Sequence, residues 1–241
     1  MAQDKRQTGP KHQSLSGVRI MGKATILKKH HKDFLELVVA EPYLTKRFYW
    51  TGGTVLSEFY LKHRESEDID LFSEEQEIYL PSINKFVGIT GTLLGAKKIT
   101  HRQFLGLHSY VFKLPKAELK VDFNYYPFSR IQRGKKWKGL EIDSIKDIAA
   151  NKIHTISTKA RERDFVDLYF ILKEMNWEIE HLIILAKTKF DWHIDPIQLG
   201  QTFTKVVALE DVPRLLVPFN KKAMERFFLD QAKKLEVDIF K

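Results

Sequence analysis

Short apolar runs and alternating apolar and polar positions in the first half of the chain predict a group of β-strands. Residues 48–51 and 69–72 are predicted to form two short strands. Residues 108–114 and 118–126 follow the strand pattern on either side of Pro115, which is typical of a hairpin. We therefore expect a β-sheet in this half of the chain.

Apolar residues at helical spacing predict helices between these strands and throughout the chain after Gly139. The pair Gly52 and Gly53 comes directly before one predicted helix, and Ser144 with Asp147 forms a capping box at the start of another. The segments with helical spacing are 18–40, 54–63, 81–94, 145–156, 165–175, 178–188, 196–207 and 220–236.

This order of elements predicts an α/β (α+β) fold in three parts. Residues 1–17 are polar and have too few apolar side chains to repay the entropy of ordering, so we expect a tail without fixed structure. Residues 18–140 are expected to form a domain around a mixed sheet with flanking helices. Residues 141–241 are expected to form a helical domain that completes a cleft with the first.

The charge balance favours a polyanionic partner. The 241 residues include 40 Lys and Arg against 31 Asp and Glu, a net charge of +9, which favours nucleic acid or a nucleotide. The chain has no cysteine, which excludes disulfides, thiolate metal sites and cysteine nucleophiles. Its apolar stretches are shorter than the roughly 20 residues of a membrane span, and residues 1–17 lack the apolar core of a secretory signal. We therefore expect a cytoplasmic protein without membrane association.

The residues most suggestive of chemistry lie between Thr51 and Phe72. Gly52 and Gly53 would let a ligand approach the backbone, and the helix that follows would offer free amides and the hydroxyl of Thr54 to phosphate oxygens.

Asp68 and Asp70 are two residues apart at the second predicted strand, so both carboxylates point to one face. Such paired carboxylates suit Mg²⁺ bound together with the phosphates of a nucleoside triphosphate. A third carboxylate is predicted on a neighbouring strand, where Asp122 lies on the polar face between the apolar Val121 and Phe123. Three carboxylates on adjacent strands could hold two metal ions and activate a nucleophile, so Asp122 is a candidate metal ligand and base.

Two motifs resemble the nucleotidyltransferase toxins of the AbiEii/MenT type, which belong to the polymerase-β-like nucleotidyltransferase superfamily. The first consists of residues 48–54, Leu56 and residues 63–72, and the second of residues 147–152 followed by Arg161, Arg163, Asp164, Phe165, Asp167 and Leu168. The similarity extends over about half of the chain, from Thr51 to Leu172.

The resemblance implies a nucleotidyltransferase catalytic domain over 18–140 and specific roles for several side chains. Gly52, Gly53 and Ser66 would contact the nucleotide phosphates, Asp68 and Asp70 would carry magnesium, Lys152 would hold the triphosphate and Asp167 would complete the site. It also implies nucleotide transfer to RNA, with transfer RNA as a target class, and a cognate antitoxin protein.

The second motif can also be interpreted from its spacing. Lys152 borders the apolar stripe of its helix, so its stem can pack while its ammonium reaches a cleft. Arg163 is a candidate nucleotide ligand, but its spacing from Asp167 is also that of a helix-surface ion pair.

A basic segment follows the strand of Asp122. Residues 129–139 contain no acidic residue, and cations interleaved with an aromatic side chain suit a single-stranded or looped RNA. A merely solvated loop would have the same composition. The candidate RNA-binding residues are Arg130, Arg133, Lys135, Lys136, Trp137 and Lys138.

These observations together favour a magnesium-dependent nucleotidyltransferase that modifies RNA as the toxin of a toxin-antitoxin pair. One alternative is an enzyme of the same fold that modifies a small molecule such as an aminoglycoside. Another is a nucleotide-binding or RNA-binding protein with a degenerate site. The basic segment favours RNA over a cationic drug, whose site should be acidic, and the intact Gly52, Asp68, Asp70 and Lys152 argue against degeneracy.

Overall fold

The computed structural model describes residues 25–191 and 195–237. Their strands form one seven-stranded mixed sheet in the order β3-β4-β5-β2-β1-β7-β6. The tail expected over 1–17 lies outside the described residues, as does the beginning of the helix expected over 18–40. The strands are β1 (Tyr49–Thr51), β2 (Ile69–Ser73), β3 (Lys98–Phe104), β4 (Leu107–Lys113), β5 (Glu118–Tyr125), β6 (Arg133–Trp137) and β7 (Leu140–Asp143).

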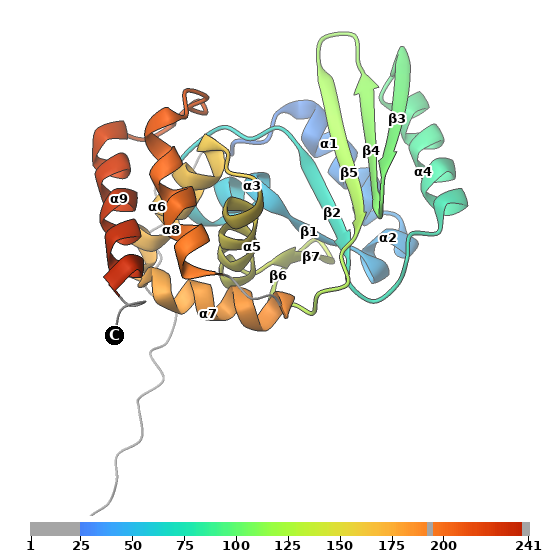
Figure 1. The fold of residues 1–241 in the computed structure, drawn as a ribbon. Helices are drawn as coiled ribbons and strands as arrows, with labels where there is room; N and C mark the ends of the chain where they lie inside the picture. Colours follow the sequence, from blue (N-terminus) through green and yellow to red (C-terminus); the bar gives the residue numbers. More distant parts are fainter. Residues whose placement is uncertain (1–24, 192–194, 238–241) are drawn as a thin grey trace, which may run out of the picture.

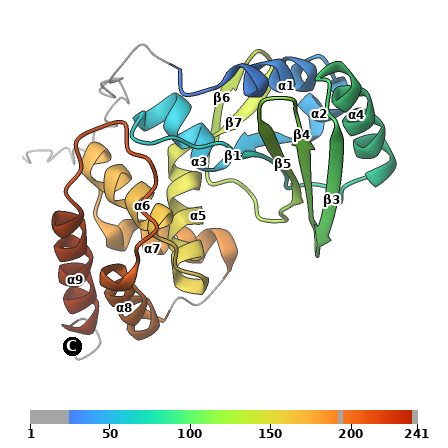
Figure 2. The same cartoon turned by 90° about the horizontal axis from the view of Figure 1, so that it is seen from above.

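Helices flank the sheet and continue beyond it (Figure 1). Helices α1, α2 and α4 lie near the β3 end, whereas α5 to α9 gather at the other end of the molecule (Figures 1 and 2). The helices are α1 (Lys29–Val39), α2 (Pro42–Arg47), α3 (Gly52–Val55), the π-helix η1 (Leu56–Leu61), α4 (Leu80–Leu93), α5 (Ile145–Thr158), α6 (Glu162–Met175), α7 (Ile179–Phe190), α8 (Pro196–Thr204), the 3₁₀ helix η2 (Lys205–Ala208) and α9 (Lys221–Val237).

This architecture confirms the expected α/β fold of a mixed sheet with flanking helices followed by a helical region. The predicted strands correspond to β1, β2, β4 and β5, and the hairpin turns at Pro115 as expected. The sequence pattern did not predict β3, β6, β7 or α2. Residues 133–137 were expected to be a loop, whereas they form the edge strand β6.

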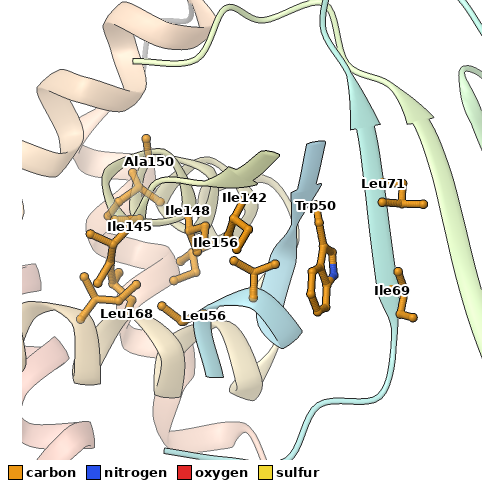
Figure 3. Close-up of a cluster of buried hydrophobic side chains, with 14 of the residues drawn as sticks. Trp50, Leu56, Ile69, Leu71, Ile142, Ile145, Ile148, Ala150, Ile156 and Leu168 are labelled. Carbon is orange, nitrogen blue, oxygen red and sulfur yellow. The ribbon is translucent and has the colours of Figure 1, made fainter. Parts of the chain in front are cut away.

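A continuous hydrophobic core joins the sheet to the helical region. Figure 3 shows Trp50 of β1 and Ile142 of β7 in the same cluster as Ile148 and Ile156 of α5. Strand β7 pairs in parallel with β1, so the sheet extends past the boundary expected at residue 140. The helical region is therefore packed directly against β1 and β7, next to β2 in the sheet.

A buried polar junction fixes the start of α5. The Ser144 hydroxyl caps the helix by accepting a hydrogen bond from the backbone amide of Asp147. The Asp147 carboxylate accepts backbone hydrogen bonds from Ile131 and Gln132 and pairs with the ammonium of Lys189 in α7 at 2.8 Å. Both charged side chains of this pair are fully buried, so α5 is held firmly against the sheet.

None of the described helices is long and apolar enough to cross a membrane.

Candidate active site

A cleft of about 410 Å³ opens between the central strands of the sheet and the helical region. Strands β2 and β5 form one wall, and α5 with the start of α6 forms the other. The residues that line the cleft include Gly52, Gly53, Ser66, Asp68, Asp70, Lys120, Asp122, Asn151, Lys152, Arg161, Arg163 and Asp164. Eight of the ten predicted catalytic, metal-binding and nucleotide-binding residues therefore come together in one place.

The three predicted carboxylates share one part of this cleft. Asp70 of β2 lies directly opposite Asp122 of the parallel strand β5, and Asp68 lies two residues before Asp70. Burial, followed by the nearby Asp122 and Asp68, raises the pKa of Asp70 to about 7. A cation bound beside Asp70 would offset both the burial and the repulsion, so the cluster suits a cation.

Lys120 is the cation that lies among these carboxylates. Its ammonium is 2.9 Å from Asp122 Oδ2 and 3.2 Å from Asp68 Oδ2. In the described part of the chain, no three His, Cys, Asp or Glu side chains are already arranged to hold a metal ion. The lysine explains this arrangement, because two of the carboxylates are turned toward its ammonium.

The chemistry of the carboxylates nevertheless fits a divalent ion. Asp122 Oδ1 is buried and has no hydrogen-bond partner among the described residues, which is costly for an anionic oxygen. A hard cation that replaced the ammonium of Lys120 would satisfy this oxygen and would offset the burial and the repulsion that raise the pKa of Asp70. Asp68, Asp70 and Asp122 are thus the residues that could hold magnesium.

The glycine pair allows the backbone to approach this cluster. Gly52 has φ +82°, and a Cβ there would lie 2.1 Å from Asp70 Oδ2. A Cβ on Gly53 would lie 2.3 Å from the guanidinium of Arg64 and 3.2 Å from Ser66 Oγ. Any side chain at either position would therefore collide with the site.

Thr54 was expected to bind the nucleotide, but its side chain does not line the cleft. Its side chain is fully buried, and its hydroxyl is 2.9 Å from Ser66 Oγ and donates to the backbone carbonyl of Asp68 at 2.6 Å. Thr54 thus positions the loop that carries Ser66 and Asp68, while Ser66 itself lines the cleft.

Lys152 lines the cleft but is also bound on its inner side. Its ammonium pairs with Asp164 at 2.7 Å and with Asp167 at 2.6 Å, and both carboxylates are fully buried. The lysine is therefore a structural cation as well as a candidate phosphate ligand.

Asp167 does not line the cleft. It accepts two hydrogen bonds from Arg64, at 2.6 and 2.8 Å, and its Oδ1 lies 2.8 Å from His63 Nε2. Burial alone would raise the pKa of Asp167, but Lys152 and Arg64 outweigh burial and hold it well below its usual range. Asp167 is thus a buried anion that fixes Arg64 and Lys152.

Arg163 is exposed and lines the cleft. The ion pair with Asp167 that its spacing allowed does not form, since Asp167 is paired with Arg64 and Lys152. Its guanidinium is thus available to an anionic ligand.

The basic segment expected to bind RNA lies apart from the cleft, and none of its six candidate residues lines it. Arg130 is almost fully buried and pairs with Glu74 and Glu141, while Trp137 packs against Trp50. These contacts hold β6 to the sheet, so Arg130 and Trp137 are structural.

The other cations of this segment lie along the edge of the sheet or just beyond it. Arg133 and Lys138 also have acidic partners, Glu141 for the first and Glu36 for the second. Lys135 and Lys136 are exposed, and an RNA contact through them stays a prediction.

Lys120 and Arg64 are among the cleft residues that were given no role in the sequence analysis. The spacing of two residues between Lys120 and Asp122 on a strand already put both side chains on one face. Arg64 was quoted in the first motif, but its two hydrogen bonds to Asp167 span 103 residues of sequence, so no local pattern reports them.

The sequence matches a protein family and a known protein. The profile of the family described as "Nucleotidyl transferase AbiEii toxin, Type IV TA system" matches residues 33–237. The uncharacterised protein aq_aa25 of Aquifex aeolicus (strain VF5) is 29% identical over 169 residues, which cover 68% of this chain and 76% of that protein.

Two solved structures from Helicobacter pylori have a similar fold. JHP933 has a TM-score of 0.54 at 20% identity and covers 87% of this chain and 91% of its own. A candidate nucleotidyltransferase has a TM-score of 0.55 at 19% identity, with coverage of 88% and 97%. At these identities the likeness concerns the fold alone.

Proposed function

The chain belongs to the AbiEii family of nucleotidyltransferase toxins, and on this premise we propose that it transfers a nucleotide from a nucleoside triphosphate to an RNA acceptor, with magnesium as the metal and transfer RNA as the favoured acceptor. The observation that carries the proposal is that Asp70 lies directly opposite Asp122, next to Asp68, in one cleft. Gly52, Gly53 and several Lys and Arg side chains line the same cleft. The net charge of +9 supports a polyanionic acceptor.

Asp68, Asp70 and Asp122 would hold the metal, and Lys120 would leave its position between two of them. A divalent ion bound there supplies charge neutralisation and polarises the phosphate oxygens. The backbone at Gly52 and Gly53 gives the triphosphate close access to this cluster, because neither residue has a side chain in the way.

Ser66 and Arg163 would bind and orient the triphosphate from opposite walls of the cleft. Lys152 would approach it from α5 while remaining tied to Asp164 and Asp167. The contact from Lys152 would favour the transition state, because the ion pairs with Asp164 and Asp167 fix its ammonium before the substrate arrives.

The acceptor hydroxyl would lose its proton to Asp122. Its Oδ2 would be freed when Lys120 leaves and would take this proton, while its buried Oδ1 would hold the metal. The acceptor oxygen would then form a bond to the α-phosphorus, and the bond from this phosphorus to the bridging oxygen of the β-phosphate would break. Pyrophosphate leaves, with its negative charge stabilised by the cations of the cleft.

The experiment is to incubate the protein with each labelled nucleoside triphosphate, magnesium and total cellular RNA, and to separate the products by size. We expect label on one RNA size class with one nucleotide. Asp70→Asn should lower this transfer by about 10²-fold or more but retain the fold, since the amide resembles the protonated carboxyl that its raised pKa already favours. Asp33→Asn, on the surface helix α1, is the matched control.

The outcome also discriminates between acceptors. Label on a small cationic molecule and none on RNA would refute the RNA acceptor and favour the small-molecule enzyme. No transfer with any nucleotide or acceptor would favour a binding protein. A cognate antitoxin is expected for a toxin of a type IV system, and both this partner and a cytoplasmic location stay predictions.

A further inference from the structure

The face of the sheet that carries the catalytic carboxylates continues past the cleft onto β4 and β3. Arg102 of β3 pairs with Ser109 of β4, which in turn pairs with Asp122 of β5. Asp122 pairs with Asp70, and residues paired directly across strands lie on the same face. Arg102 therefore shares the face of Asp70 at a distance of three strands, or about 14 Å along the sheet.

The opposite face of these strands is covered. Helices α1 and α4 pack there, where the Phe34 ring lies 5.8 Å from that of Phe112 and the Tyr110 hydroxyl donates to Asn84 at 2.7 Å. Figure 2 shows both helices on one side of β3, β4 and β5, and no helix of the described chain covers the other side. The catalytic face of β3 is thus open, with Lys98, Thr100, Arg102 and Phe104 all exposed.

This outer part of the sheet belongs to the longest acid-free segment near the site. Residues 78–117 contain six Lys or Arg and no Asp or Glu. Lys98 and Arg102 form no ion pair with any of the described residues, in contrast to Arg130, Arg133 and Lys138 of the segment around β6. Two unpaired cations on the catalytic face would attract a phosphate backbone.

The tip of the β3–β4 hairpin adds exposed apolar side chains. Phe104 is 73% exposed and Leu105 is 81% exposed, the highest values among the large hydrophobic residues described. Leu107, which pairs with Phe104, is one of the residues that line the cleft. A continuous surface therefore leads from the carboxylates to an exposed aromatic ring.

We infer that the catalytic face of β3 and β4 binds the single-stranded end of the RNA acceptor. Lys98 and Arg102 neutralise its phosphates, and Phe104 stacks on a base. Cations on an edge strand also prevent sheets from pairing with each other, but that role does not require an exposed Phe104 beside them. The inference rests on the proposed RNA acceptor.

The test measures the affinity of the full-length protein for a short single-stranded RNA and for transfer RNA over a range of salt concentrations, without nucleotide. The Lys98→Ser/Arg102→Ser variant should reduce the logarithmic salt slope by about 1.4, or 0.7 for each lost phosphate contact. Phe104→Ser should weaken binding about tenfold without changing the slope. Arg102→Lys should retain the slope, because it keeps the charge.

Lys135→Ser/Lys136→Ser is the matched control, since it removes the same charge from β6, the other edge strand of the sheet. It should leave the slope nearly unchanged, and all variants should bind nucleoside triphosphate with magnesium as the wild type does. A slope that responds to the β6 variant and not to the β3 variant would overturn the inference.

The two proposals can fail separately. Suppose that the wild type labels RNA but the β3 variants keep its affinity for RNA and its salt slope. The inference that β3 and β4 bind the acceptor is then wrong, and the proposed function stands. If the wild type binds RNA through this face but transfers no nucleotide to it, the acceptor in the proposed function is wrong. The inference is also overturned if the wild type binds neither the single-stranded RNA nor transfer RNA. The exposed cations of β3 would then serve to prevent pairing between sheets, or the face would bind a protein partner.

Discussion

Replacement of Lys120 by methionine tests whether the lysine occupies the place of a metal ion. Methionine retains most of the apolar stem and removes the ammonium that lies between Asp68 and Asp122. In the wild type a divalent ion must displace this ammonium before it can bind both carboxylates. We therefore expect Lys120→Met to bind Mg²⁺ or Mn²⁺ more tightly than the wild type in the absence of nucleotide.

The size of the effect follows from the two ion pairs that the metal must break. The Lys120 side chain is 40% exposed, and those of Asp68 and Asp122 are 35% and 11% exposed. Pairs this accessible contribute about 0.5–1 kcal/mol each, because solvent screens them. Loss of both corresponds to about 1–2 kcal/mol, so metal affinity should increase about 5-fold to 30-fold.

Titration calorimetry with Mn²⁺ measures this change directly, at about pH 8 so that Asp70, with a pKa of about 7, is mostly ionised. Without metal, the variant should also unfold at a lower temperature than the wild type, and metal should restore part of the loss. Lys113→Met is the control, since it removes the same charge from the adjacent strand, where the lysine lies 3.9 Å from Glu118. Equal or weaker metal binding by Lys120→Met would refute the reasoning.

Three further predictions concern the surroundings of the carboxylates. Gly52→Ala should destabilise the protein by at least about 1 kcal/mol in chemical denaturation, because alanine disfavours φ +82° and its Cβ would collide with Asp70. Lys152→Ala should lower both nucleotide transfer and the free energy of unfolding. The free energy of unfolding should fall by about 3 kcal/mol, because the buried Asp167 loses one of its cations, and an unchanged melting temperature would contradict this. Burial raises the pKa of Asp143 from 3.8 to about 7. Between about pH 4 and 7 the folded protein therefore keeps a proton that the unfolded chain loses, and the free energy of unfolding should fall by up to about 1.4 kcal/mol per pH unit. Asp143→Asn should reduce the slope of that part of the stability profile, to which Asp70 with its pKa of about 7 also contributes, and identical profiles for variant and wild type would exclude Asp143 as a cause.

The placements that the sequence predicted correctly are those that depend on local spacing. Asp68 and Asp70 share a face because strand side chains alternate, and Ser144 caps α5 because its partner is three residues away. Even Asp122, from a distant segment, was predictable, since the alternation with Val121 and Phe123 fixed its face. Its direct pairing with Asp70 depends on strand order, which no local pattern specifies.

The errors concern long-range pairing. The charges between residues 129 and 139 suggested a free basic surface, but Arg130 is bound by Glu74 and Glu141, of which Glu74 is 56 residues away in sequence. Composition counts a cation in the same way whether it faces solvent or a buried acid. For that reason Arg130 was expected to contact RNA, while the unpaired Lys98 and Arg102 were not considered.

The same distinction limits how the cleft can bind a triphosphate. Lys152 is committed to two buried carboxylates, and Arg64 to Asp167. Of the cations that line the cleft, Arg163 is the one without an acidic partner among the described residues, and Lys120 is tied to the very carboxylates that would hold a metal. A nucleoside triphosphate that entered alone would thus meet more uncompensated anions than free cations. Because a metal ion that displaces Lys120 both neutralises the carboxylates and releases an ammonium, metal and nucleotide should each strengthen the binding of the other.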